Sequence, residues 1–121
     1  MDIQQLYEFC LAKKGVTEHF PFDDTTLVFK VGGKMFCLMS LKEWEYGIPS
    51  LNLKCDPDRS LELRAQYESI NPGYHMNKIH WNTVDFNGDV SNKMICELIK
   101  HSYDLVFNSL SKKIQISLNN Y

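Results

Sequence analysis

The densest group of side chains that could do chemistry lies in one stretch, PGYHMNKIHWNTV, at residues 72–84. It contains two of the four histidines, a lysine, a tyrosine, a tryptophan and two asparagines, and it contains no acid. Cations contact phosphates and aromatic faces stack on bases, so this mixture suits contact with nucleic acid. The same residues also suit a turn that leads into a strand, with the aromatic rings packed at the edge of a core. Both interpretations stay open on the residues alone.

Further cations precede this stretch and extend the candidate surface toward the N-terminus. Four acids between residues 56 and 68 dilute their positive charge. The predicted nucleic-acid-binding residues are Lys54, Arg59, Arg64, Tyr74, His75, Lys78, His80 and Trp81.

Motifs for catalysis or metal binding are not evident in the sequence. It contains no GxSxG, HExxH, Walker A or dinucleotide fingerprint. Gly32-Gly33-Lys34 joins two apolar runs rather than opening a helix, which indicates a hairpin and not a phosphate loop. His75 and His80 are five residues apart, a spacing that does not place them on one helical face. We therefore predict no enzyme activity, no catalytic residue, no cofactor and no metal site, and keep a site at these two histidines as a distant alternative.

The overall charge gives no general attraction to nucleic acid or to an anionic membrane. The chain has 13 basic and 15 acidic residues, so any such binding would depend on a local patch. The four cysteines form no CxxC pair, which favours buried, reduced thiols. The first ten residues, MDIQQLYEFC, are neither basic nor continuously apolar, so we expect no signal peptide and no membrane span. These features together predict a cytoplasmic protein.

The first half of the chain predicts a helix followed by a hairpin. Residues 2–14 have apolar side chains at helical spacing behind a plausible cap, Asp2, and residues 16–24 are expected to form a connector. Gly32-Gly33 predicts a two-residue turn with Val31 opposite Lys34. The hairpin register then pairs Phe29 with Phe36, and Leu27 with Leu38. Residues 43–49 are expected to form a loop, and residues 51–54 alternate as in a third strand.

The second half predicts two further helices around a strand. Asp56-Pro57 opens a helix that ends near residue 68, residues 78–86 alternate as a strand, and Ser91 caps a last helix. A very short strand could follow Asn87-Gly88. The order α-β-β-β-α-β(-β)-α predicts an α+β fold of two layers, with helices on a mostly antiparallel sheet. Residues 1–113 are expected to form one domain, and residues 114–121 a C-terminal tail, either an edge strand or a mobile end.

Five segments together resemble the MmcQ/YjbR family in content and order: HFPFDD, FKVGGKMFCLMSL, LNLKCDP, the stretch at residues 72–84, and ELIKHSYDLV. The resemblance implies a frataxin-type or secretion-chaperone-like α/β domain. The family is commonly labelled DNA-binding through a "double wing" of strands, with no established enzyme activity or cofactor. The family motif covers Lys54, Pro57, Pro72, Gly73, Tyr74, His75, Lys78, His80, Trp81, Ser102, Tyr103 and Asp104.

The leading hypothesis from the sequence is a non-enzymatic binding domain whose expected ligand is DNA. The alternative is a protein–protein interaction or adaptor module, with an exposed apolar patch that includes Trp44 and Tyr46. The oligomeric state is left open by the sequence.

Overall fold

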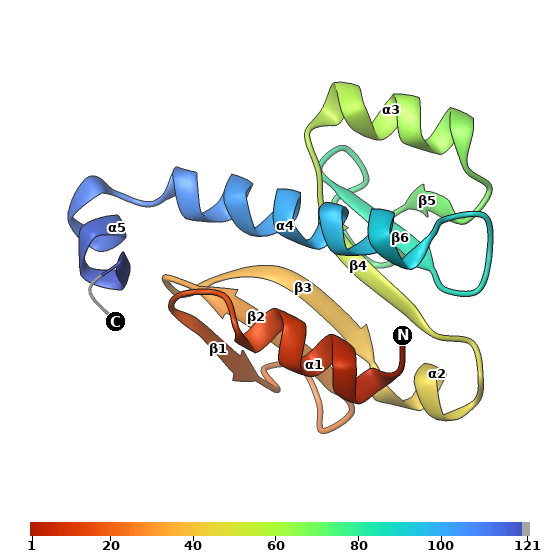
Figure 1. Cartoon of the computed structure of the whole chain (residues 1–121), viewed down its shortest axis with the longest axis horizontal. Coiled ribbons are helices and arrows are strands. Elements are labelled where there is room, and N and C mark those ends of the chain that lie inside the picture. The colour runs from red at the N-terminus through yellow and green to blue at the C-terminus, as the bar shows by residue number, and fades with distance from the viewer. Residues whose placement is uncertain (120–121) are drawn as a thin grey trace.

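The computed structural model describes residues 1–119 of the chain, and this part contains six strands and five helices (Figure 1). In chain order they are α1 (Ile3–Leu11), β1 (Val16–His19), β2 (Thr26–Val31), β3 (Lys34–Ser40), α2 (Leu41–Glu45), β4 (Ser50–Lys54), α3 (Pro57–Gln66), β5 (Ile70–Pro72), β6 (Trp81–Asp85), α4 (Asn92–Ser109) and α5 (Lys112–Asn119).

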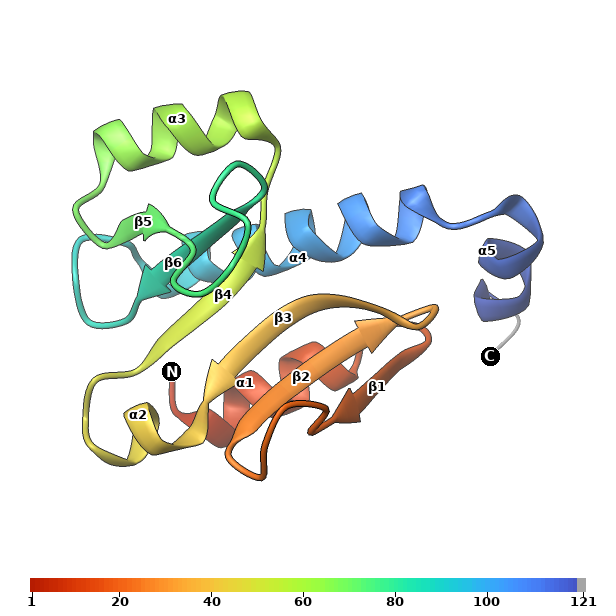
Figure 2. The ribbon, with the colours of Figure 1, turned by 180° about the vertical axis from the view of Figure 1, so that it is seen from behind.

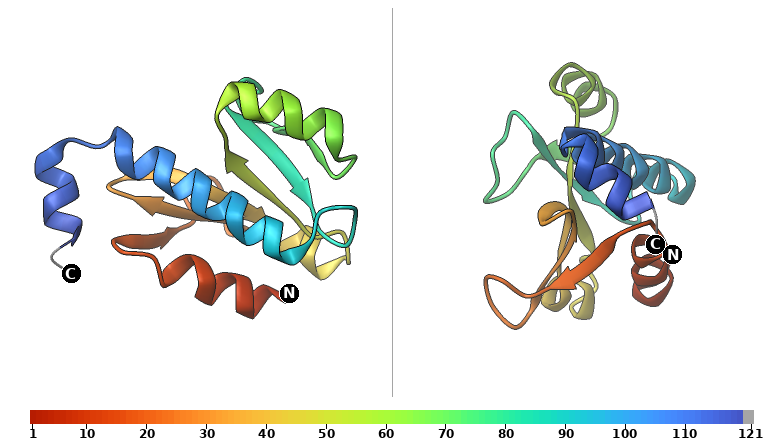
Figure 3. Two further views of the ribbon diagram at one scale, coloured as in Figure 1. Left: turned by 45° about the horizontal axis from the view of Figure 1, so that its top comes forward. Right: turned by 90° about the vertical axis from the view of Figure 1, so that its left-hand side faces the viewer.

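The six strands form one antiparallel sheet in the order β1-β2-β3-β4-β6-β5. Helices α1 and α4 cover one face of it, and α3 packs against the β5 end (Figure 1). Among the described residues, 1–119, the opposite face carries no helix of comparable length. Two loops, residues 20–25 between β1 and β2 and residues 73–80 between β5 and β6, project from it (Figure 3, right). The predicted α+β fold with helices on an antiparallel sheet is confirmed.

The predicted caps are also confirmed. Asp2 and Gln5 form a capping box at the start of α1, Asp56 accepts from the Arg59 N–H ahead of α3, and Ser91 accepts from the Met94 N–H ahead of α4. Each cap satisfies a backbone N–H that the first helical turn leaves free, so short polar residues fix where these helices begin.

The central hairpin turns where predicted, but its register shifts after two residue pairs. Gly32 and Gly33 have positive φ angles, 58° and 81°, and Val31 lies opposite Lys34. Lys30 then pairs with Met35, whereas Phe29 pairs with Cys37, so β3 contains one extra residue, Phe36. This is a β-bulge, in which two residues of one strand face one residue of its partner. The predicted Phe29–Phe36 and Leu27–Leu38 pairs are therefore wrong.

The bulge changes which face each residue of β3 occupies. Phe36, Cys37 and Met39 all lie in the main core beneath the helices. Leu38 instead points to the other face, where it packs with Val28 and Trp81. Side chains alternate strictly only in a regular strand, so one inserted residue reverses the faces of every residue beyond it.

Three segments before residue 73 differ from the sequence-based prediction. Residues 16–19 form edge strand β1, where one partly buried residue among exposed ones gives no alternation to detect. Residues 41–45 form the short helix α2, capped by Ser40, in place of the predicted loop. The extra short strand is β5, before β6 and not after Asn87-Gly88.

Residues 112–119 form helix α5 and not an edge strand. The apolar residues at positions 114, 116 and 118 alternate, but 114 and 118 also share one face of a helix. The Ser111 hydroxyl accepts from the Ile114 N–H, and Leu118 packs against the main core. The last two residues of the predicted tail lie outside the described part of the chain. Within residues 1–119, no helix combines the length and apolar character needed to cross a membrane.

Ser102 of α4 bridges the two central strands, β3 and β4. These strands pair directly only through Cys37–Leu53 and Leu38–Asn52. At the next position the fully buried Ser102 hydroxyl accepts from the Lys54 N–H at 2.9 Å and donates to the Phe36 carbonyl at 2.5 Å. The side chain thus replaces the ladder bond that would join these two backbone groups, and it ties the helix to both strands.

Ser102→Ala should lower the free energy of unfolding by about 1–3 kcal/mol, because two buried backbone groups lose their partner. Urea unfolding followed by circular dichroism measures this. Ser109→Ala is the matched control, since Ser109 is an exposed serine on the same helix; it should change stability by less than about 0.5 kcal/mol. Equal effects of the two variants would contradict the bridging role.

Candidate ligand cleft on the open face of the sheet

Three of the eight residues predicted to bind nucleic acid instead make contacts within the protein, in and around the 73–80 loop. They are the cations Arg64 and Lys78, and Trp81. Arg64 of α3 donates from Nε to Asn82 Oδ1 at 2.7 Å and from Nη2 to the carbonyls of Lys78 and Trp81 at 2.5 and 3.1 Å. Lys78 Nζ donates to the Gly73 carbonyl at 2.9 Å, across the same loop. These donors hold the loop in shape, and in this arrangement they are not directed at an external phosphate.

Trp81, the third of these residues, is buried and packs with Val28 and Leu38, together with Met35 and Met76, in a small second core on the open face. Gly73 beside it has no room for a side chain, because a Cβ there would lie 2.9 Å from the Trp81 Cβ. The Pro-Gly turn and the tryptophan therefore form one packed unit. Trp81 is in this respect a core-edge aromatic residue.

The other five predicted residues form two groups. The side chains of Lys54, Arg59 and His80 make no hydrogen bond or ion pair within residues 1–119. Tyr74 and His75 are exposed at the loop, with ring centroids 4.0 Å apart. His75 has a φ angle of 59°, a left-handed conformation that costs a non-glycine residue about 1 kcal/mol or more. Backbone strain of this kind is frequent in loops that bind ligands.

Tyr74 and His75 form part of the wall of a cleft of about 630 Å³ on the open face, which is the face turned toward the viewer in Figure 2. A row of register partners crosses the sheet beneath it, in the order Val28, Leu38, Asn52 and Thr83. Partners in an antiparallel ladder share a face, so the last three of this row line the cleft floor together. Thr26 and Ser40, which are register partners on β2 and β3, also line the floor.

The two projecting loops provide the walls. Phe22 comes from the 20–25 loop, with 64% of its surface exposed, and Met76 joins Tyr74 and His75 from the 73–80 loop. The two loops are far apart in the sequence. The cleft exists because β1-β2 and β6-β5 lie at opposite ends of the sheet and both loops project from the same face (Figure 3).

A hydrogen-bond chain orients the polar floor. The Tyr74 N–H donates to Thr83 Oγ1 at 3.0 Å, and Thr83 Oγ1 lies 2.6 Å from Asn52 Oδ1. The threonine hydroxyl accepts from a backbone donor, so its own proton goes to the asparagine carbonyl. The Asn52 amide NH₂ is then left without a partner within residues 1–119. It gives the middle of the cleft a hydrogen-bond donor.

One end of the cleft is acidic. Glu43 of α2 accepts from the Ser50 hydroxyl at 3.1 Å, and Asp85 at the end of β6 lies near Glu43. Burial raises the pKa of the Asp85 carboxyl above its ordinary value, and the negative charge of Glu43 raises that pKa further. The Asp85 side chain accepts no hydrogen bond from residues 1–119. It is therefore a free acceptor beside a second carboxylate.

Nucleophilic and metal chemistry find little support in the described residues. The four cysteines are free thiols. A hydrogen bond with Cys10, together with burial, raises the pKa of the Cys37 thiol, so it stays protonated. No group of three or more His, Cys, Asp or Glu within residues 1–119 is placed to hold a metal ion. What the cleft offers a ligand is therefore a set of hydrogen-bond donors, acceptors and apolar walls.

The apolar patch expected around Trp44 and Tyr46 is only partly present. Trp44 is half-buried, its ring packs on Phe86 with centroids 4.8 Å apart, and its Nε1–H donates to the Ser50 carbonyl. Tyr46 is 74% exposed. The neighbouring Ile48 is also exposed and lines the acidic end of the cleft.

Sequence reasoning missed most residues of the cleft, including Phe22, Asn52, Thr83, Glu43 and Asp85. The available signal was a set of small or acidic polar residues at alternate strand positions: Thr26, Ser40, Ser50, Asn52, Thr83 and Asp85. Each pattern by itself indicates only a solvated strand face. These residues come together only because of the order of the strands in the sheet, and the sequence of one strand does not reveal that order.

Comparison with known proteins gives a consistent result. A family model described as YjbR matches residues 11–105. The chain is 41% identical to the uncharacterized protein YbdF of Escherichia coli O157:H7, with 95% of each chain covered, and 32% identical to the uncharacterized protein YjbR of Escherichia coli K12, with 93% of each covered.

Solved structures are similar over nearly the whole chain. The Deinococcus radiodurans protein DR2400, described as a DUF419 domain, superposes with a TM-score of 0.88 and 39% identity, over 98% of this chain and 88% of that chain. A Pseudomonas syringae protein superposes with a TM-score of 0.73 and 29% identity, over 88% of this chain and 99% of that chain.

Arg64→Ala should destabilise the fold by about 2–3 kcal/mol, because it removes three charge-assisted hydrogen bonds that hold the 73–80 loop. Thermal and urea unfolding measure this effect. Arg59→Ala on the same helix is the control and should stay within about 0.5 kcal/mol of the parent. Unchanged stability of Arg64→Ala would mean that these bonds do not hold the loop.

Proposed function

The chain belongs to the YjbR family, and from this premise we propose that it is a binding domain whose site is the cleft on the open face of the sheet. The observation that carries the proposal is the cleft of about 630 Å³ between the 20–25 and 73–80 loops. Its volume lies within the range of small-molecule sites, roughly 300–1,000 Å³. Its lining combines apolar walls with a few converging polar groups, as such sites do.

Contacts within the protein hold the wall of the cleft in place without a ligand. Arg64 and Lys78 fix one wall through bonds to backbone carbonyls, and Trp81 packs beneath that wall. A preformed site loses less conformational entropy on binding, which favours affinity. The domain acts by binding and not by catalysis in this proposal. It works without a cofactor in the cytoplasm, where free thiols such as Cys37 stay reduced.

A screen of small fragments by ¹⁵N–¹H NMR tests the site. We expect the fragments that bind to shift the amide signals of residues on β4, β6 and the 73–80 loop. Phe22→Ala and Tyr74→Ala should each weaken the best fragment about tenfold, because each removes roughly 1.5 kcal/mol of apolar contact.

Leu61→Ala is the control for this screen, since Leu61 is an apolar residue on α3 with 65% exposure that does not line the cleft. It should leave affinity unchanged. Fragments that bind elsewhere, or that bind the two wall variants as well as the parent, would contradict the proposal.

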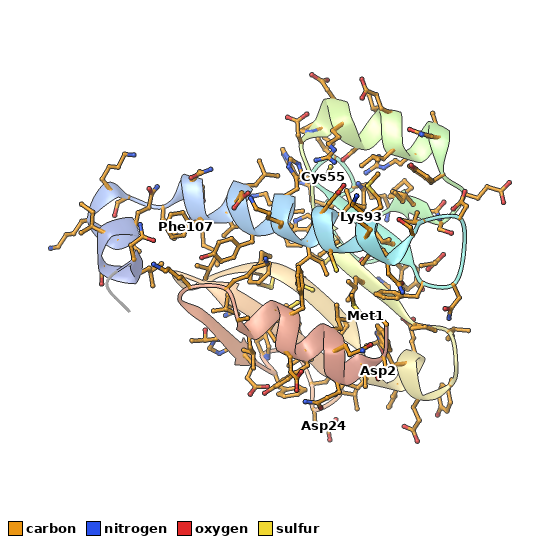
Figure 4. The ribbon with its side chains drawn as sticks, viewed as in Figure 1. Met1, Asp2, Asp24, Cys55, Lys93 and Phe107 are labelled. Carbon is orange, nitrogen blue, oxygen red and sulfur yellow. The ribbon has the colours of Figure 1, made fainter. Side chains whose placement is uncertain are left out.

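Nucleic acid is the second candidate ligand. It is favoured by the exposed Tyr74 and His75 rings together with Lys54, Arg59 and His80, whose side chains form no bonds within residues 1–119. Aromatic faces stack on unpaired bases and cations contact phosphates, so this combination suits a single strand more than a duplex. Asp24 on the opposite loop lies at the edge of the molecule and adds an acidic group there (Figure 4).

Fluorescence anisotropy of a labelled single-stranded DNA 12-mer, at about 50 and 200 mM salt, tests this candidate. Reversing Lys54 and Arg59 to Glu should weaken binding and lower the salt slope by about 0.7 for each phosphate that the protein no longer neutralises. Lys112→Glu on α5 is the control for Lys54→Glu, because it changes the net charge by the same amount at a distant site. Binding that is absent, or that responds equally to Lys54→Glu and Lys112→Glu, would remove nucleic acid from consideration.

A further inference from the structure

We propose that the cleft takes a small organic amine, with its ammonium group at the Glu43–Asp85 end and its apolar or aromatic body between the two loops. This inference rests on the proposed function, because it assigns a ligand class to the same cleft.

The first argument is uncompensated negative charge. Glu43 and Asp85 lie at one end of the cleft, and neither forms an ion pair with a lysine, arginine or histidine of residues 1–119. The lone ion pair in this part of the chain joins Lys100 and Asp104 on α4. Two neighbouring carboxylates repel each other, and a cation between them relieves that repulsion while donating a charge-assisted hydrogen bond to each.

The second argument is the availability of acceptor atoms. Glu43 receives one hydrogen bond to its side chain, from Ser50, and the Asp85 carboxylate receives none from residues 1–119. A carboxylate offers about four acceptor positions, and an ammonium group offers three donors. The donors of an amine thus meet acceptors that the fold leaves open.

The third argument is the character of the remaining lining. Leu38, Met39 and Met76 provide apolar surface, Ile48 borders the acidic end, and Phe22 and Tyr74 offer aromatic faces. An apolar body of the size of a bicyclic ring fits within about 630 Å³. The Asn52 amide in the middle of the floor would accommodate a hydrogen-bond acceptor on that body. An anionic ligand placed in the same way would bring like charges together.

The test compares two probes with the same ring and opposite charge, tryptamine and 3-indolepropionic acid, in ¹⁵N–¹H NMR titrations of the full chain at pH 7. We expect tryptamine to shift amides of β4, β6 and the 73–80 loop in a saturable way. We expect indolepropionate to bind at least about tenfold more weakly, because its carboxylate faces Glu43 and Asp85.

Asp85→Asn and Glu43→Gln should each weaken tryptamine by about fivefold to tenfold and should not weaken indolepropionate. Both variants keep the size of the side chain, and a dispersed spectrum in each titration verifies that they fold. Glu62→Gln, which removes an exposed acid of α3 outside the cleft, is the matched control and should leave tryptamine binding unchanged.

The outcomes separate this inference from the proposed function. Equal binding of both probes in the cleft, or tryptamine binding that survives Asp85→Asn and Glu43→Gln, overturns the amine inference and leaves the cleft as a binding site. Absence of tryptamine binding at millimolar concentration also overturns it. The proposed function fails if the wider fragment screen finds no ligand in the cleft, or if its fragments bind the Phe22 and Tyr74 variants as well as the parent.

Discussion

The structure depends on how the two halves of the sheet are joined between β3 and β4. These strands share only the pairs Cys37–Leu53 and Leu38–Asn52, and the Ser102 hydroxyl replaces the next bond of the ladder. A fully buried serine in this position satisfies two backbone groups that have no water to bind. The central helix is thereby fixed to both halves at one point.

The cleft lies over the same junction. Leu38 and Asn52, the second of the two direct pairs, are also the centre of its floor. Leu38 reaches this face because the bulge at Phe36 reverses the alternation of β3. There Leu38 packs with Val28 and Trp81 in a second small core. An irregularity in one strand therefore both completes the main core and builds the floor of the candidate site.

The charged residues of the chain have separate tasks. Arg64 and Lys78 use their donors to hold a loop, whereas Glu43 and Asp85 lie in the cleft without a cationic partner in the described chain. Partial desolvation of the Asp85 carboxyl and the negative charge of Glu43 raise the pKa of that carboxyl above its ordinary value. Unfavourable electrostatics of this kind are frequent at functional sites. The contrast supports the proposal that the cleft, and not the basic stretch, is the binding site.

The sequence by itself determined the features that depend on local interactions. Asp2, Asp56 and Ser91 cap their helices, Gly32-Gly33 forms the turn, and the alternation at residues 51–54 and 78–86 indicates strands, because each depends on a few neighbouring residues. The second of these strands is shorter than predicted, since residues 78–80 belong to the 73–80 loop and β6 covers only Trp81–Asp85. The sequence also grouped Arg64, Lys78 and Trp81 with Tyr74 and His75, but it could not show that the first three would be used internally. Only the tertiary structure decided the bulge at Phe36, the bridge by Ser102, the helix at residues 112–119, and the meeting of Phe22, Asn52 and Asp85. The Ser102 bridge and the cleft arise from contacts between segments far apart in the chain, and the bulge and the last helix also depend on the core that covers them, so their energies depend on the partner that each segment meets in the folded protein.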